Sequence, residues 1–186
     1  MDHFYENIKG WFTFPLLYSI SVDQFPSGSH FVEVGSWLGK SSAFMAVCIA
    51  NSGKNIKFDC VDTWQGSEEH GLTTDEEKEH LFQQFLTNMQ PVRHLINPIR
   101  LPSLVAAKLY ADESLDFVFI DASHDYENVK ADLIAWYPKV KKGGIISGHD
   151  YLGEYEWPGV YKAVNEFFSG KNLQCNGNET SWMHYK

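Results

Sequence analysis

Cysteine is scarce in this 186-residue sequence, and its three cysteines, Cys48, Cys60 and Cys175, lie far apart without any C-x-x-C pair. Their odd number and wide spacing argue against a disulfide framework and against a structural zinc site. The sequence also lacks an apolar run near the roughly 20 residues needed to cross a membrane. Its first nine residues have neither the basic start nor the apolar stretch of a signal peptide. We therefore expect a cytoplasmic protein.

Clustered positive charge is missing as well. The formal net charge is −9, and the densest basic stretch, residues 139–142, is typical of a helix end. A protein that binds nucleic acid usually carries a basic patch that neutralises phosphates. We therefore expect no nucleic-acid and no membrane partner, and favour a small molecule or a sugar.

Strand-like and helix-like segments alternate along the chain. Helices are expected within residues 8–22, 39–51, 75–89, 103–110, 125–137 and 158–168. Apolar runs predict strands at 30–34, 56–61, 95–101, 115–121 and 143–147, and Asn-Gly at 176–177 favours a terminal hairpin between 173–175 and 180–185. This alternation predicts an α/β fold with a doubly wound, mostly parallel sheet and one antiparallel strand.

A glycine loop leads from the first predicted strand into a helix. Gly35 and Gly39 let the backbone turn tightly and approach a ligand, and the helix N-terminus at Ser41 offers N–H groups. The closing Gly-Lys-Ser is similar to a phosphate-binding P-loop, but three residues separate the glycines where the P-loop has four. Glu33 would also repel a triphosphate and suits a cationic ligand. A ligand-free structural turn is the other alternative.

A second acid, Asp62, ends the second predicted strand. In dinucleotide-type folds an acid at this place binds ribose hydroxyls, and a helix cap is the simpler alternative. Trp64 follows closely and either stacks on adenine or fills the core.

Four sequence blocks then occur in a telling order: EVGSWLGKSS from Glu33, VDTW from Val61, DFVFIDASHDY from Asp116 and GGIISGHDY from Gly143. Over roughly residues 28–170 the sequence resembles class I S-adenosylmethionine-dependent methyltransferases, most closely methyltransferase family 24. The resemblance implies a Rossmann-like sheet of seven strands with an antiparallel last strand. It also implies S-adenosylmethionine as cofactor. We expect a single domain, residues 1–186, with a helical cover at 1–27 and a catalytic core at 28–186.

The resemblance also assigns cofactor-binding residues. It implies that Glu33, Gly35, Ser36 and Gly39 contact the methionine part, Asp62 the ribose, Leu101, Pro102 and Ser103 the adenine, and that Asp121 lies beneath the sulfonium. We add Ser41 and Trp64 for the reasons above. The polar stretch 68–75 departs from the pattern and is a candidate lid.

Acids and histidines follow the fourth and fifth predicted strands: Asp121 and His124, then His149 and Asp150. Either histidine, oriented by an acid, can serve as the base for a hydroxyl nucleophile. Alternatively Asp121, His149 and Asp150 hold a divalent metal that lowers the pKa of the hydroxyl. The sequence is similar to metal-dependent O-methyltransferases for catechols and macrolide sugars, except that His149 stands where those have an acid or amide. Histidine suits manganese, iron or zinc better than magnesium. The simpler alternative is that His124 and Asp150 bond only to loop backbone.

We therefore predict an O-methyltransferase for a small hydroxylated molecule or a sugar. Methylation at nitrogen or another atom, a non-catalytic cofactor-binding or assembly subunit, and a P-loop nucleotide hydrolase are the alternatives. A set of N-terminal aromatics forms either the dimer face of a homo-oligomer or a cover for the substrate site: Phe4, Tyr5, Trp11, Phe12 and Phe14.

Overall fold

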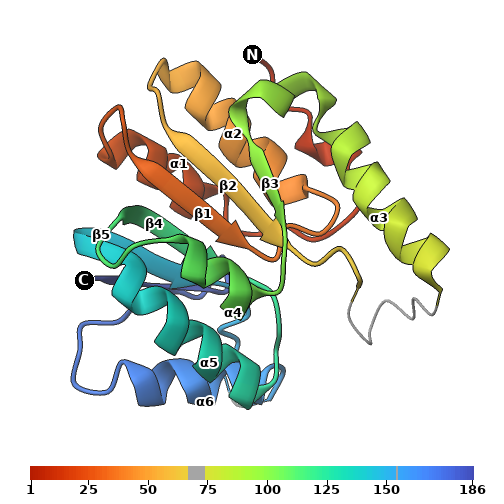
Figure 1. Ribbon diagram of the computed structural model, residues 1–186. Helices are drawn as coiled ribbons and strands as arrows, with labels where there is room; N and C mark the ends of the chain where they lie inside the picture. Colours follow the sequence, from red (N-terminus) through yellow and green to blue (C-terminus); the bar gives the residue numbers. More distant parts are fainter. Residues whose placement is uncertain (67–73, 154) are drawn as a thin grey trace.

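The computed structural model describes residues 1–66, 74–153 and 155–186, and it confirms the predicted α/β fold (Figure 1). One seven-stranded sheet has the order β3-β2-β1-β4-β5-β7-β6. All its neighbouring strands run parallel except β7, which is antiparallel to both β5 and β6. The strands are β1 His30–Val34, β2 Lys57–Asp62, β3 Asn97–Arg100, β4 Leu115–Ile120, β5 Val140–Gly148, β6 Gln174–Asn176 and β7 Ser181–Tyr185.

Helices cover both faces of the sheet (Figure 1). They are α1 Pro15–Gln24, α2 Lys40–Ser52, α3 Asp75–Asn88, α4 Ser103–Ala106, α5 Tyr126–Trp136 and α6 Pro158–Phe167. Because side chains alternate along a strand, β1 sends Phe31 into the core beneath α1, α2 and α3, and Val32 and Val34 into the core beneath α4, α5 and α6. The two-sided apolar character of β1 and β4 thus reflects burial on both faces.

Local signals place several helix ends. Thr74 and Glu77 form a capping box at the start of α3, and Asp125 accepts a hydrogen bond from the backbone N–H of Asn128 at the start of α5. Pro158 occupies the first turn of α6, where its missing N–H group costs no hydrogen bond.

Two local expectations are corrected. One or two helices were expected within residues 8–22; the structure has one, α1, which starts only at Pro15, and a 3-10 turn at Tyr5–Asn7 precedes the expected range. From the sequence, Ser103 is the expected N-cap of the 103–110 helix, and this is wrong: Pro102 is the N-cap residue, and the Ser103 hydroxyl donates instead to Asp132. Residues 68–73 of the candidate lid lie outside the described residues.

The strand order reverses between β1 and β4, since β1 pairs with β2 on one side and with β4 on the other. In open α/β sheets such a switch point opens a crevice at the carboxyl ends of the strands, where ligands bind. In the described part of the chain, no helix combines the length and apolar character that a membrane crossing needs.

Candidate functional site

A cavity of about 1170 Å³ occupies this crevice. Its walls come from the loops after β1, β2, β3, β4 and β5 and from the N-terminal segment. The predicted cofactor residues that line it are Gly35, Ser36, Ser41, Asp62, Ser103 and Asp121, and the predicted catalytic residues His124, His149 and Asp150 line it too. The sequence therefore singled out part of the cavity wall, and the wall also contains many residues that it did not single out.

Gly35 is required where the loop after β1 passes the end of β4. Its φ is +96°, and a Cβ at this position would lie 1.9 Å from the backbone oxygen of Asp121. Any side chain would therefore both strain the backbone and force the two strand ends apart. This close approach keeps the glycine loop and Asp121 on the same wall of the cavity.

Asp62 holds the glycine loop in shape. Its two carboxylate oxygens accept hydrogen bonds from the backbone N–H groups of Trp37, at 2.8 Å, and Trp64, at 2.7 Å. Both tryptophans have positive φ values, 42° and 49°, which are uncommon for residues other than glycine. Burial raises the pKa of Asp62, although these hydrogen bonds oppose the shift.

The backbone of this loop does not form a phosphate cradle. The N–H of Gly35 donates to the carbonyl of Val61, that of Trp37 to Asp62, and that of Gly39 to the carbonyl of Ser36. A P-loop needs its amides to point at phosphates. These amides bond within the protein, so the geometry argues against the P-loop alternative.

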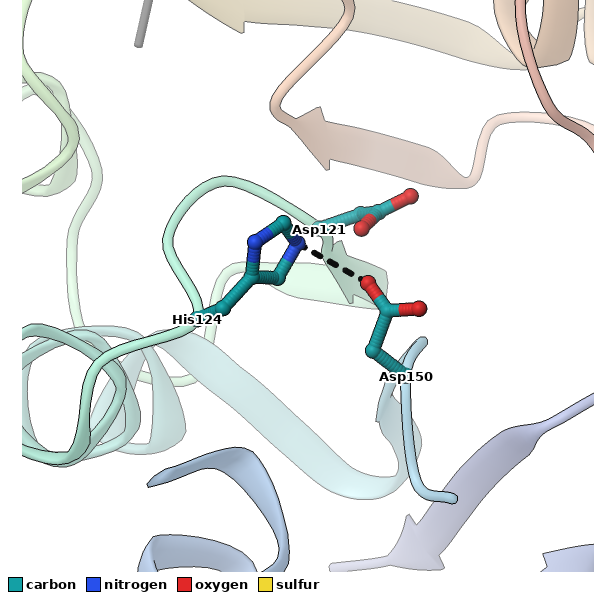
Figure 2. Close-up of side chains that lie close together, drawn as sticks. All are labelled: Asp121, His124 and Asp150. Carbon is teal, nitrogen blue, oxygen red and sulfur yellow. Dashed lines mark ion pairs between the residues drawn. The ribbon is translucent and has the colours of Figure 1, made fainter. Parts of the chain in front are cut away.

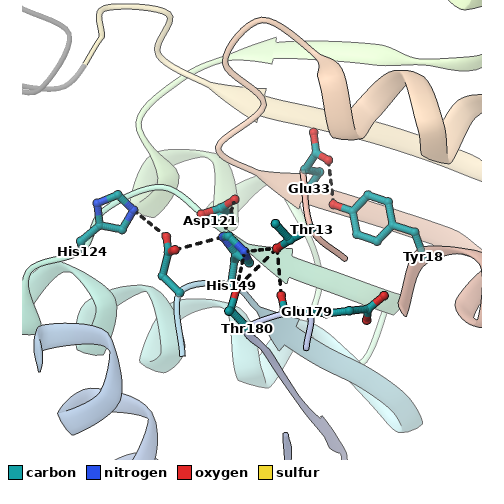
Figure 3. Close-up of polar contacts among 9 residues, drawn as sticks. Thr13, Tyr18, Glu33, Asp121, His124, His149, Glu179 and Thr180 are labelled. Carbon is teal, nitrogen blue, oxygen red and sulfur yellow. Dashed lines mark hydrogen bonds and ion pairs between the residues drawn. The ribbon is translucent and has the colours of Figure 1, made fainter. Parts of the chain in front are cut away.

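Glu33 lies beneath the cavity rather than on its wall. It projects from β1 to the same side as Phe31, where its carboxylate accepts a hydrogen bond from Tyr18, at 2.7 Å (Figure 3), and another from Ser42. It is 1% exposed, and burial raises its pKa despite these bonds. Glu33 thus connects β1, next to the glycine loop, to α1 and α2. The resemblance implied that Glu33 contacts the methionine part of the cofactor, but its side chain does not line the cavity.

Gly39 and Trp64 also lie off the cavity wall. A Cβ on Gly39 would lie 2.7 Å from the Met89 side chain, so this glycine allows the loop to pack closely on its neighbour. Trp64 is fully buried, packs against Phe82 and Phe85, and donates from Nε1 to the backbone oxygen of Trp37 at 2.7 Å. Of the two alternatives for Trp64, the structure supports core packing.

One polar atom of the loop is left without a partner. The Ser36 hydroxyl oxygen is buried and has no hydrogen-bond partner among the described residues. Such an atom is costly unless something bonds to it. Because Ser36 lines the cavity, a ligand in the cavity can supply that bond.

At the other side of the cavity, His124 pairs with Asp150. The His124 Nε2 atom lies 2.9 Å from Asp150 Oδ2 (Figure 2), and the centroid of the imidazole ring lies 4.0 Å from that of the Trp157 ring. Asp150 has a φ of 58°, an unusual backbone conformation that turns its carboxylate between the two histidines. The two histidine pairings lower the pKa of Asp150 against the effect of its burial.

Both ring nitrogens of His149 have polar partners. Its Nδ1 atom lies 3.2 Å from Asp150 and 3.7 Å from Asp121, and its Nε2 atom lies 2.8 Å from the hydroxyls of both Thr13 and Thr180 (Figure 3). Burial lowers its pKa, but the hydrogen bonds and negative charges of the two aspartates outweigh burial and raise the pKa to about 10. His149 is therefore a cation at neutral pH and joins the N-terminal segment to β5 and to the loop before β7.

Three side chains form a possible ligand set for a metal ion: Asp121, His124 and Asp150, each with one donor atom within 4.8 Å of the others (Figure 2). The set predicted from the sequence contained His149 in place of His124. In the structure His124 takes the place of His149 in this set. His149 is already engaged, because its Nδ1 atom faces the two carboxylates as a donor and its Nε2 atom faces two hydroxyls.

A known protein family matches the sequence of this region. The model of a methyltransferase domain family matches residues 32–151, which span the glycine loop, Asp62 and both histidines. The chain belongs to this methyltransferase family. The resemblance to class I S-adenosylmethionine-dependent methyltransferases is thereby confirmed at the level of the family.

A curated relative of this methyltransferase is an uncharacterised protein of Sinorhizobium fredii, 29% identical over 121 residues. The match covers 64% of this chain but only 13% of the relative, so the chain spans a small part of that protein's length.

Solved structures share the fold. The O-methyltransferase NovP has a TM-score of 0.68 at 17% identity, covering 92% of this chain and 78% of its own. CalS11, a TDP-rhamnose 3'-O-methyltransferase, has a TM-score of 0.63 at 14% identity, with 92% and 77% covered. TomG from Streptomyces achromogenes, solved with S-adenosylmethionine, has a TM-score of 0.64 at 11% identity, with 92% and 78% covered. At these identities the likeness shows the fold.

Sequence reasoning did not identify several residues that are remote from the motifs in sequence but contact the site residues or line the cavity. Thr13 and Thr180 bond to His149, Trp157 packs on His124, and Asp132 lines the cavity from α5. Trp11 also lines it, while Phe14 is buried, so part of the N-terminal aromatic set covers the site. No local motif marks these residues, because each acquires its place from a contact distant in sequence.

Proposed function

We propose that this methyltransferase transfers the methyl group of S-adenosylmethionine to a hydroxyl oxygen of a small molecule or a sugar. One observation carries the proposal: the His124–Asp150 pair shares a single cavity with the glycine loop and Asp62. NovP is described as an O-methyltransferase, CalS11 as a calicheamicin methyltransferase and TomG as an O-methyltransferase involved in tomaymycin synthesis. The fold that they share with this chain is in line with the proposal.

The cavity fits the cofactor. Ligand sites commonly have volumes of about 300–1,000 Å³. At about 1170 Å³ this cavity has room for a cofactor and an acceptor together. The unpartnered hydroxyl of Ser36 and the N-terminus of α2 at Ser41 suit the amino-acid part, and Asp62 suits the ribose hydroxyls. When bound, the cofactor supplies an electrophilic methyl carbon, and the protein contributes position and proton handling.

His124 is the residue we assign as general base. A hydroxyl acceptor must lose its proton as the new bond to carbon forms, and an imidazole is suited to take it near neutral pH. Asp150, paired with Nε2 at 2.9 Å, stabilises the imidazolium that results. Trp157 packs on the ring and fixes its orientation.

His149 then has a positioning role. Because its pKa is raised to about 10, it already carries a proton at neutral pH and is not available to accept another. Its charge instead holds Asp121 and Asp150 in place against their mutual repulsion. Of the two histidines left open by the sequence, the geometry therefore favours His124 as base.

A metal-assisted reaction is the second candidate, and the set Asp121, His124 and Asp150 supports it. Two carboxylates and one imidazole suit manganese, iron or zinc. These residues would hold the ion, and a bound divalent ion supplies Lewis-acid stabilisation of the acceptor oxygen.

The experiment is methyl transfer from labelled S-adenosylmethionine to a panel of sugars, sugar nucleotides and phenols, with and without chelator and added manganese. We expect turnover by the wild type and a loss of about 100-fold or more in His124→Ala, as for removal of a general base. His94→Ala, an exposed histidine, is the matched control. Activity that a chelator abolishes and manganese restores would favour the metal-assisted reaction.

Calorimetry separates the remaining alternatives. Binding of S-adenosylhomocysteine without turnover on any acceptor would support a non-catalytic subunit. No binding of either sulfur nucleoside would contradict the proposed function.

A further inference from the structure

The N-terminal segment, residues 10–14, contributes to the cavity wall from outside the region that the family model matches, which begins at residue 32. Its side chains alternate in direction. Phe12 and Phe14 pack with the core beneath α1, α2 and α3, whereas Trp11 and Thr13 line the cavity. The two phenylalanines therefore anchor the segment, and the other two side chains are available to a ligand.

Trp11 presents an open aromatic face at the cavity. Its indole stacks on that of Trp37, with ring centroids 5.8 Å apart and an angle of 15° between the ring planes. The side chain is nevertheless 81% exposed, so the face away from Trp37 is uncovered. Indole rings supply large apolar contact areas and are frequent anchors of binding sites. An open indole on the wall of a cavity therefore indicates a ligand that packs on it.

The support beneath this indole is fixed before any ligand binds. The Trp37 backbone N–H donates to Asp62 at 2.8 Å, and its carbonyl accepts from Trp64 Nε1 at 2.7 Å. Gly10 lies directly against the Trp37 ring, because a Cβ at this glycine would lie 2.6 Å from Cζ3. The open face of Trp11 is thus held in one orientation. A preorganised group of this kind loses little conformational entropy when it binds.

Thr13 ties the segment to the catalytic side chains. Its hydroxyl lies 2.8 Å from His149 Nε2, and His149 contacts Asp150, the partner of His124 (Figure 3). Two residues of chain span at most about 7 Å between Cα atoms. Trp11 therefore lies near this cluster, and a ring packed on the indole has its edge on the side of the general base.

We propose that Trp11 is a specificity-determining residue for the acceptor, and that the acceptor is a hydroxylated six-membered ring whose face packs on the open indole. This inference rests on the proposed function, because it concerns the acceptor of that reaction, and it narrows the acceptor to cyclic compounds. A pyranose has C–H groups on its face and hydroxyls at its edge, and a phenol has a π face with hydroxyls at its edge. An open-chain polyol has the hydroxyls without the face.

The test is a saturation-transfer NMR titration of the protein saturated with S-adenosylhomocysteine. The probes are methyl β-D-glucopyranoside, catechol and D-glucitol, an open-chain polyol. We expect at least one of the two rings to bind roughly 5-fold or more tightly than glucitol, because only a ring gains the aromatic contact. Which ring binds more tightly distinguishes a sugar acceptor from a phenolic one.

Substitutions assign the preference to the indole. Trp11→Ala should weaken binding of the preferred ring by about 5- to 10-fold and remove its advantage over glucitol, whereas Trp11→Phe keeps an aromatic face and should stay within about 3-fold of the wild type. Tyr155→Ala is the matched control and should bind as the wild type does, because Tyr155 is 96% exposed and lies off the cavity wall. Unchanged affinity for S-adenosylhomocysteine shows that each variant is folded.

Several results would overturn the inference while leaving the proposed function intact. These are equal binding of the rings and glucitol, no binding of either ring, and an unchanged ring affinity in Trp11→Ala. A loss in Trp11→Ala that Trp11→Phe does not restore would also overturn it, because the effect would then not depend on an aromatic face. Failure of the wild type to bind S-adenosylhomocysteine would instead remove the proposed function and this inference together.

Discussion

Asp132 predicts an unusual pH dependence of stability. Its pKa rises from the ordinary 3.8 to about 6, first because of burial, although the Ser103 hydrogen bond opposes the change. A carboxyl whose pKa is raised on folding contributes stability that is fully present below pH 3.8. That stability is lost as the pH rises through about 6. At 1.36 kcal/mol per pKa unit the loss is on the order of 3 kcal/mol.

The variant Asp132→Asn lacks this ionisation, so its stability relative to the wild type should improve with pH. We expect the difference in unfolding free energy, variant minus wild type, to be about 2.4 kcal/mol more favourable at pH 8 than at pH 4, because a small part of the loss has already occurred at pH 4. Urea unfolding followed by tryptophan fluorescence and circular dichroism measures it. Taking the difference cancels the groups that titrate identically in both proteins.

The control and the contrary result are clear. Asp112→Asn makes the same chemical change at an exposed acid and should show less than about 1 kcal/mol of pH dependence in the same difference. A difference for Asp132→Asn that stays flat, or that falls as the pH rises, would refute the argument that burial dominates at this carboxyl.

Two further predictions concern the cavity wall. Gly35→Ala places a Cβ 1.9 Å from the Asp121 backbone oxygen at a φ of +96°, so we expect about 3 kcal/mol or more of destabilisation and loss of S-adenosylhomocysteine binding. Thermal unfolding measures the stability and calorimetry the binding. A variant as stable as the wild type would contradict the close approach of the two strand ends. Trp11→Ala removes a ring that is 81% exposed and stacks on Trp37 at the cavity, so KM for the acceptor should rise several-fold while the affinity for S-adenosylhomocysteine changes little. The control is Tyr155→Ala, because Tyr155 is 96% exposed and lies off the cavity wall. Equal effects of the two substitutions would argue against a role of Trp11 in acceptor binding.

The sequence by itself determined the order of the elements and part of the cavity wall. Alternation of apolar side chains, the two glycines around the loop and the caps at Thr74 and Asp125 are local signals, and they act over a few residues. Parallel strands also bring their carboxyl ends to one edge, so the blocks after β1, β2, β4 and β5 had to meet. The resemblance to a methyltransferase family depended on these same blocks.

Only the tertiary structure decided what each polar residue does there. His124 and His149 both follow strands and are indistinguishable by spacing, but Thr13 and Thr180, remote in sequence, surround His149 and leave His124 with Asp150 and Trp157. Glu33 is one residue from the cavity-lining Val34, yet the alternation of side chains across β1 turns it to the opposite face, toward Tyr18 and Ser42.

Asp132 shows the same limit most clearly. In sequence it is an acid inside an amphipathic helix, which is typical of a solvated face. The packing of α5 against α4 buries it at 5% exposure and brings it to Ser103, 29 positions earlier in the chain. Burial and orientation of a side chain depend on the elements packed around it, and these come from distant parts of the sequence.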